Sequence, residues 1–151
     1  MQLEEFLVKA KVSAYADEGE GGERILEDGC RELTCREGEF AYRDRYYGWD
    51  PFVGEEVVRR GEETIWAMNY YGRVLADDVP AAKVYAFLQE AMGRVGVERS
   101  FRGPERFTKD GFEYADESHG GVDSFTGVER IRLGGREIYR LYYHGGGVKG
   151  K

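Results

Sequence analysis

The residues best suited to chemistry in this chain are acidic side chains that recur at matching places in its two halves. Asp44 matches Asp116, and Glu56 matches Glu129. Two carboxylates that meet near a common axis can bind a cation or a basic ligand, or act as an acid–base pair. The structural alternative is that each acid pairs with a nearby arginine such as Arg43, Arg59 or Arg132. Recurrence favours the structural alternative, because a duplicated fold keeps what each half needs.

Aromatic side chains form a second group of candidates, with 11 Tyr, 8 Phe and 2 Trp in 151 residues. Aromatic residues suit strands and fill cores, so four of them are assigned to the core: Trp66, Tyr70, Tyr139 and Tyr143. Tyr47, Trp49 and Tyr71 are better placed for exposed contact with a flat or cationic ligand. We therefore include these three among the candidate ligand-binding residues.

Asn69 and His144 complete the candidate ligand-binding set, because strand alternation turns both away from the core. Cys35 with His144 is a conceivable nucleophile–base pair, although nothing in their spacing supports it. The glycines at 145–147 precede no helix, so they do not form a phosphate loop. No catalytic residue, metal site or cofactor is predicted.

The chain is predicted to be an internal duplication, because residues 52–72 align with residues 125–145 without a gap. Eight of these 21 positions are identical, among them Gly54/Gly127 and Tyr70/Tyr143. At an offset of 72, the pattern Phe-x-Tyr-x-Asp at 40–44 recurs at 112–116. We expect one domain over residues 1–151, with unit one at about 1–76 and unit two at about 77–148.

Hydrophobic periodicity predicts an α+β fold with two helices and about eight antiparallel strands, related by a pseudo-two-fold axis. The helices are expected at 2–12 and 80–92, the second capped by Asp77 or Asp78. The strands are expected at 32–37, 40–46, 55–60, 64–71, 106–109, 112–116, 128–133 and 137–144. The segments 13–28 and 47–51 are expected to be loops. Such duplications often leave a cleft between the halves.

Composition and charge limit the classes of partner that this chain is expected to bind. The net charge of −7 and the absence of a basic stripe argue against direct nucleic-acid binding. No apolar run reaches the length of a membrane span, and the first ten residues do not have the pattern of a signal peptide. We therefore expect a cytoplasmic protein without a membrane partner.

Several runs resemble a prokaryotic domain of unknown function, number 5680 in the domain-family nomenclature. They are FLVKAK, GEEVV, IWAMNYYGRVL, FRGPERF, FTGVERI and LYYHGG, spread over nearly the whole chain. Members of that family often resemble the C-terminal part of regulators whose N-terminal part is a helix-turn-helix of the XRE type. We expect this chain to lack that DNA-binding segment. The resemblance implies a regulatory, ligand-binding or protein-binding role and assigns no site residue.

The favoured hypothesis is a module that senses a small molecule or peptide, related to transcriptional regulators. The first alternative is a protein-interaction module, including a homodimer formed through a sheet edge or an aromatic patch. The second alternative is an enzyme that uses the paired acids or a Cys–His site in the cleft between the repeats. No sequence motif demands catalysis, so an enzyme is ranked last.

Overall fold

The computed structural model describes residues 1–16 and 23–151. The first half of the chain contains α1 (Leu3–Ala16), β1 (Arg24–Ile25), β2 (Arg31–Glu37), β3 (Phe40–Gly48), β4 (Phe52–Arg60) and β5 (Glu63–Val74). The second half contains α2 (Ala81–Met92), the 3₁₀ helix η1 (Val97–Arg99), β6 (Arg106–Lys109), β7 (Phe112–Gly121), β8 (Ser124–Leu133) and β9 (Arg136–Gly147).

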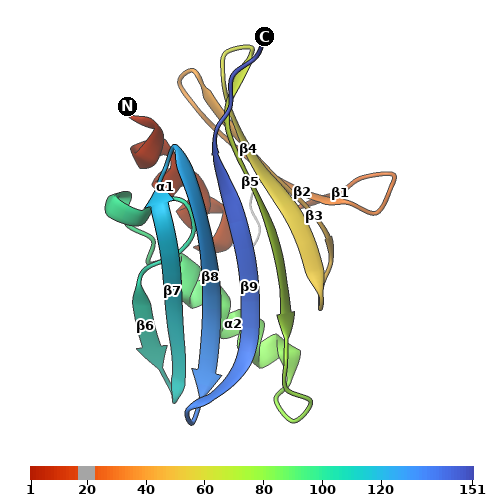
Figure 1. Cartoon of the computed structure of the whole chain (residues 1–151). Helices are drawn as coiled ribbons and strands as arrows, with labels where there is room; N and C mark the ends of the chain where they lie inside the picture. Colours follow the sequence, from red (N-terminus) through yellow and green to blue (C-terminus); the bar gives the residue numbers. More distant parts are fainter. Residues whose placement is uncertain (17–22) are drawn as a thin grey trace.

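The strands form one antiparallel sheet in the order β1-β2-β3-β4-β5-β9-β8-β7-β6 (Figure 1). Each half therefore builds a meander of consecutive strands, and the two meanders join along their last strands, β5 and β9. In that central pair Tyr70 lies directly opposite Tyr143. The sheet thus brings together two residues that the sequence alignment had matched.

Both helices cover the same face of the curved sheet (Figure 1). α1 packs against β2 and β3, α2 packs against β7, and the two helices contact each other. Alternation along β5 and β9 gives this inner face Trp66, Met68 and Tyr70 from one half, and Tyr139, Leu141 and Tyr143 from the other. All six side chains are buried, as the sequence pattern predicted. We call the opposite side of the sheet the outer face.

The α+β class, the two helices and the eight expected strands are all present, with most strands longer than predicted. Three local expectations were wrong. α1 continues to Ala16, and β1 forms within the segment 13–28 that was expected to be a loop. Residues 17–22 of that segment lie outside the described part of the chain. β3 continues to Gly48, into the segment 47–51 that was also expected to be a loop. α2 has Pro80 as its N-cap with no side-chain cap, because Asp77 and Asp78 both precede the cap position, and Asp78 forms an ion pair with Arg136.

Two glycines in the middle of strands make room for the central tyrosines. Gly54 on β4 lies opposite Tyr70, and Gly127 on β8 lies opposite Tyr143. A Cβ atom at Gly54 would lie 2.3 Å from the Tyr70 hydroxyl oxygen, and one at Gly127 would lie 2.0 Å from Cζ of Tyr143. Each tyrosine ring therefore lies flat over the backbone of its neighbouring strand, which is a recurrent reason for glycine inside a strand.

No helix in residues 1–16 or 23–151 combines the length and the apolar character needed to span a membrane.

Replacing Gly127 by alanine should destabilise the fold, because the new methyl group would displace the ring of Tyr143. We expect a loss of about 1–3 kcal/mol in the free energy of unfolding, as for other overpacked core positions. Gly121→Ala is the matched control, because a Cβ atom there meets nothing within 4 Å. Urea unfolding of both variants would measure the difference, and equal stability of the two would contradict this account.

Candidate functional site

Four carboxylates are buried together on the inner face of the sheet. Asp44 and Glu56 lie opposite each other on β3 and β4, and Asp116 and Glu129 lie opposite each other on β7 and β8. None of the four is more than 4% exposed. A buried carboxylate is costly unless it is paired with a cation or accepts hydrogen bonds, so the groups around these acids determine whether the fold is stable.

The Glu56 carboxylate is compensated from α1. The Lys11 ammonium lies 2.7 Å from Oε1 of Glu56, and both side chains are fully buried. The Tyr42 hydroxyl donates to the same oxygen at 2.5 Å. Lys11 also lies 5.9 Å from the centroid of the Trp66 ring, at cation–π distance. One helix residue thus holds the first acid pair against the sheet.

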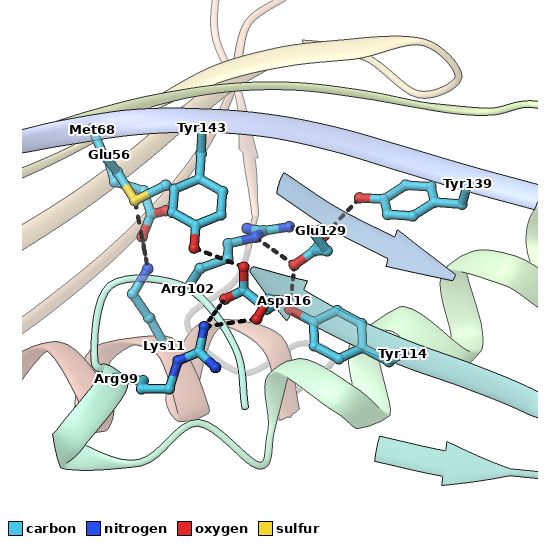
Figure 2. A network of polar contacts seen from close by, with 10 residues as sticks. All are labelled: Lys11, Glu56, Met68, Arg99, Arg102, Tyr114, Asp116, Glu129, Tyr139 and Tyr143. Carbon is cyan, nitrogen blue, oxygen red and sulfur yellow. Dashed lines mark hydrogen bonds and ion pairs between the residues drawn. The ribbon is translucent and has the colours of Figure 1, made fainter. Parts of the chain in front are cut away.

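The Glu129 carboxylate has a more complete set of partners (Figure 2). Arg102 binds it with two hydrogen bonds, from Nε at 2.9 Å and from Nη2 at 3.1 Å. Tyr114 and Tyr139 donate to its two oxygens at 2.6 and 2.9 Å. Burial raises the pKa of both tyrosines well above its usual range, so their hydroxyls remain protonated donors. The two hydrogen bonds from Arg102 to Glu129 have the planar bidentate geometry in which arginine binds a carboxylate most strongly.

The two aspartates are held by the central tyrosines. Tyr70 donates to Asp44 at 2.5 Å, and Tyr143 donates to Asp116 at 2.7 Å. Arg99 from η1 adds an ion pair with Asp116 at 3.4 Å and donates to the Asp116 backbone oxygen at 2.8 Å. Arg102 links the two halves, because it binds Glu129, lies 5.5 Å from the centroid of the Tyr70 ring, and its charge favours the ionised forms of both Asp44 and Asp116, opposing the rise in their pKa.

Burial changes the proton affinity of this network. Desolvation, with the nearby Glu56 charge, raises the pKa of Asp44 to about 7. The same two causes, with Glu129 as the neighbour, raise the pKa of Asp116 to about 6. Desolvation lowers the pKa of Lys11 even though Glu56 opposes that shift. The network can therefore take up or release protons near neutral pH.

Three cations lie at the four buried carboxylates of the network. Lys11 pairs with Glu56, the partly exposed Arg99 pairs with Asp116, and Arg102 pairs with Glu129 (Figure 2). One buried oxygen of Glu56 and one of Asp116 accept no hydrogen bond. Buried acceptors of this kind are uncommon in folded proteins and mark places where the network can accept a further donor.

A cavity of about 450 Å³ opens beside β7 and reaches this network. Asp116, Ser118 and Arg99 line its inner side, and Ala115 with three further arginines lines its outer side. The cavity exists because β6 pairs only with residues 112–115 of β7. Beyond Ala115, the Asp116 backbone N–H donates to the Glu105 carbonyl at 3.0 Å, and Arg99 donates to the Asp116 carbonyl at 2.8 Å and to the Ser118 hydroxyl at 3.0 Å.

Comparison with known proteins places this architecture in a family. The family model described as "Domain of unknown function (DUF5680)" matches residues 44–148. The chain belongs to the DUF5680 family. The matched region contains all four buried carboxylates and the cavity, while Lys11 and Tyr42 precede it. No curated protein and no solved structure matches the chain.

The nine residues predicted to bind ligand are divided between the two faces of this DUF5680 domain. Asp44, Glu56, Asp116 and Glu129 meet in the inner network. Tyr47, Asn69, Tyr71 and His144 lie on the outer face and are exposed, and Asn69 lies directly opposite His144. Trp49 lies in the β3–β4 connection, where its ring packs edge-on against Tyr85 of α2, with the ring centroids 5.3 Å apart. The predicted residues therefore do not form one cleft between the halves.

Two proposed pairings do not form. Cys35 is directed to the inner face from β2, whereas His144 lies on the outer face of β9, and three strands separate β2 from β9. A Cys35–His144 catalytic pair is therefore excluded by the topology. The buried acids also do not pair with Arg43, Arg59 or Arg132. Arg59, for example, binds the exposed Glu62 at 3.2 Å.

Sequence reasoning missed the cations and hydroxyl donors of the network. Lys11 follows Leu7 by four positions, so the helical period placed it on the buried face of α1. Tyr42 and Tyr114 recur in the aligned pattern, and Gly54 and Gly127 are identical between the halves. Their recurrence was a signal, but in the sequence it served only as evidence of an internal duplication. Arg102 lies in an irregular segment after η1 and had no such signal.

The raised pKa of Asp44 makes the stability of this domain depend on pH. The folded chain holds the Asp44 proton more tightly than the unfolded chain, whose carboxyl pKa is about 4. The stabilising contribution of this proton is therefore complete below pH 4 and disappears as the pH rises to about 7. Asp44→Asn keeps a neutral acceptor for Tyr70, so this variant should lose less stability than the natural chain between pH 5 and pH 8.

Urea unfolding at several pH values would measure this effect. Asp77→Asn, at an exposed position, is the control and should follow the natural chain. Parallel curves for Asp44→Asn and the natural chain would show that Asp44 is ionised throughout this range.

Arg102→Met should destabilise the domain by about 3–5 kcal/mol, because it leaves the Glu129 carboxylate buried without a cation. Adding Glu129→Gln in the same chain should restore part of this loss, since a neutral amide removes the uncompensated charge. Arg59→Met is the matched control and should have little effect, because its ion pair with Glu62 is exposed. Equal small losses for Arg102→Met and Arg59→Met would refute a structural role for the Arg102–Glu129 pair.

Proposed function

We propose that this domain is a small-molecule sensing module whose effector binds in the cavity beside β7. One observation carries the proposal: Asp116 and Arg99 belong both to the cavity wall and to the buried network. A molecule that binds in the cavity therefore contacts Asp116 and Arg99, whose charges interact with the buried network. This feature distinguishes the cavity from a surface depression with no connection to the core.

The size and chemistry of the cavity suit a small polar effector. Small-molecule sites commonly enclose about 300–1,000 Å³ and contain a few convergent polar groups. Here a cavity of about 450 Å³ is lined by Asp116, Ser118 and arginine side chains. The Asp116 carboxyl has a raised pKa of about 6, as is frequent at functional sites. A ligand group that changes the protonation of Asp116 would also change its bond with Tyr143.

The network offers a physical route from the cavity to α1. Asp116 is bonded to Tyr143, which faces Tyr70 across the central strands. Tyr70 is bonded to Asp44, which lies opposite Glu56, and Glu56 holds Lys11 of α1. A ligand that binds one arrangement of this network better than another would shift the population of α1 positions. The resemblance to C-terminal parts of helix-turn-helix regulators supports a sensing role that reaches the N-terminal helix.

Internal duplication gives the simplest origin for this arrangement, and we include it in the proposal. Irregularities in the strand ladder fall at Val58/Arg59 and at Ile131/Arg132, which are 73 residues apart like the aligned segments. The Gly–Tyr and Asp–Tyr contacts also recur at that spacing or at 72. On this hypothesis the two halves began with the same acid pair, and the acid pair of the second half came to border the cavity beside β7.

A thermal-shift screen with metabolites would test the sensing proposal. A cavity ligand at about 100 times its Kd should raise the melting temperature by about 5 °C or more. Ala115→Leu should abolish this shift, because the larger side chain occupies the cavity. Ala41→Leu is the matched control, at another half-buried alanine on the outer face. Ligands that stabilise the natural chain and Ala115→Leu equally would show that they bind elsewhere.

A second candidate function, protein association, is favoured by an aromatic row on the outer face. The residues Tyr47, Val53, Tyr71, Tyr142 and Val128 lie opposite one another on β3, β4, β5, β9 and β8. The first four are between 46% and 53% exposed. Contiguous exposed apolar side chains of this kind occur at interaction surfaces. A homodimer that pairs these rows is the simplest form of this alternative.

Light scattering after size exclusion would test the homodimer. If the rows pair, the natural chain should elute as a dimer, and Tyr71→Ser with Tyr142→Ser should convert it to a monomer of unchanged secondary structure. A natural chain that remains monomeric at high concentration would contradict homodimerisation.

A further inference from the structure

Two arginines on the cavity wall, Arg106 and Arg132, form no close ion pair, although Arg132 lies opposite Glu113 and Glu137 in the strand register. Within residues 1–16 and 23–151, the side chains of Arg106 and Arg132 form no ion pair and no hydrogen bond. Both line the cavity, Arg106 from β6 and Arg132 from β8. Most other arginines of this acidic chain are paired with a carboxylate, such as Arg60 with Glu39 and Arg136 with Asp78. Within the described residues Arg36 and Arg73 also form no ion pair, so Arg106 and Arg132 are distinguished by their position together at one cavity.

The strand register places these arginines around a small side chain. Ala115 of β7 lies between Arg106 of β6 and Arg130 of β8, directly opposite both. Neighbouring strands are about 4.8 Å apart, so two arginines separated by one strand lie about 10 Å apart at the backbone. Arginine side chains can close that distance, and the methyl group of Ala115 leaves the space between them open. Arg132, two positions beyond Arg130, adds a third guanidinium on the same side.

Arg130 is held in place by two acids, Glu137 of β9 and Glu117, of which Glu117 also lines the cavity. It pairs with Glu137 of β9 at 3.3 Å and with the exposed Glu117 at 3.6 Å. Glu137 is bound more closely by Arg140, at 2.5 Å. Arg130 is thus oriented by these acids, while the side chains of Arg106 and Arg132 donate no hydrogen bond within the described residues.

We propose that the cavity recognises its ligand through an oxyanion group, a phosphate or a carboxylate, bound by Arg106 and Arg132 above Ala115. Guanidinium groups match both anions because they donate parallel hydrogen bonds in one plane. This inference rests on the proposed sensing function and specifies its ligand class. Ser118, Glu105 and Glu117 at the same cavity can accept or exchange hydrogen bonds with hydroxyl or amino groups on the rest of the ligand.

The test uses inorganic phosphate and malonate as probes, at constant ionic strength set with chloride. Binding to the full chain is measured by calorimetry and by NMR shifts of the Ala115 and Ser118 amides. We expect saturable binding of at least one probe and a rise in its Kd of about tenfold or more in the double variant Arg106→Gln/Arg132→Gln. Arg36→Gln, an exposed arginine on β2, is the charge control and should bind as the natural chain does.

The two probes distinguish the source of the oxyanion. Preference for phosphate indicates a phosphorylated metabolite, and preference for malonate indicates a carboxylic acid. Binding that is unchanged in Arg106→Gln/Arg132→Gln, or reduced equally in Arg36→Gln, would overturn the inference and show a nonspecific ionic effect.

The metabolite screen separates failure of this inference from failure of the proposed function. If neither probe binds but a metabolite without an oxyanion binds and is blocked by Ala115→Leu, the sensing function stands and the oxyanion class is wrong. If neither the probes nor any metabolite binds in a manner sensitive to Ala115→Leu, both proposals fail.

Discussion

Burial of two cross-strand acid pairs under one sheet is the constraint on which the rest of this structure depends. Carboxylates on neighbouring strands repel each other, and removal from water raises that cost. Buried cations and tyrosine hydroxyls contact these carboxylates and offset that cost. Even the helix positions follow from this requirement, since Lys11 must reach Glu56 from α1. The mid-strand glycines follow as well, since Tyr70 and Tyr143 need room to reach Asp44 and Asp116.

The two halves meet the same requirement in different ways. Glu56 relies on a single ammonium and one tyrosine, whereas Glu129 has a bidentate guanidinium and two tyrosines. The lengths of the edge strands differ too: β2 has seven residues and covers β3 past Asp44, whereas β6 has four and ends before Asp116. The second half therefore exposes one side of its acid pair to a cavity. This difference, more than any catalytic motif, is the observation on which the proposed binding of a small molecule rests.

The inner network and the outer face give this domain two distinct chemical surfaces. The network joins both halves through Arg102, and the desolvation of its aspartates raises their pKa toward neutral pH. The outer face carries aromatic side chains in one row and arginines in the next, where Arg73, Arg140 and Arg130 lie opposite one another. The cavity lies where that arginine row reaches the edge of the network, so a ligand there contacts both surfaces.

The sequence by itself determined the helices, eight of the strands, the faces of β5 and β9, and the family. These features follow from the spacing of hydrophobic residues, which recur about every 3.6 residues in a helix and every two residues in a strand, and from local turn signals. Both depend on residues that are close together in the chain. It also pointed to the four acids, because they recur at matching positions. Only the tertiary structure decided their partners, since Lys11, Arg99 and Arg102 lie far from those acids in sequence and reach them through packing. The cavity likewise depends on where β6 ends relative to β7, and strand register is a property of paired segments that no single segment contains.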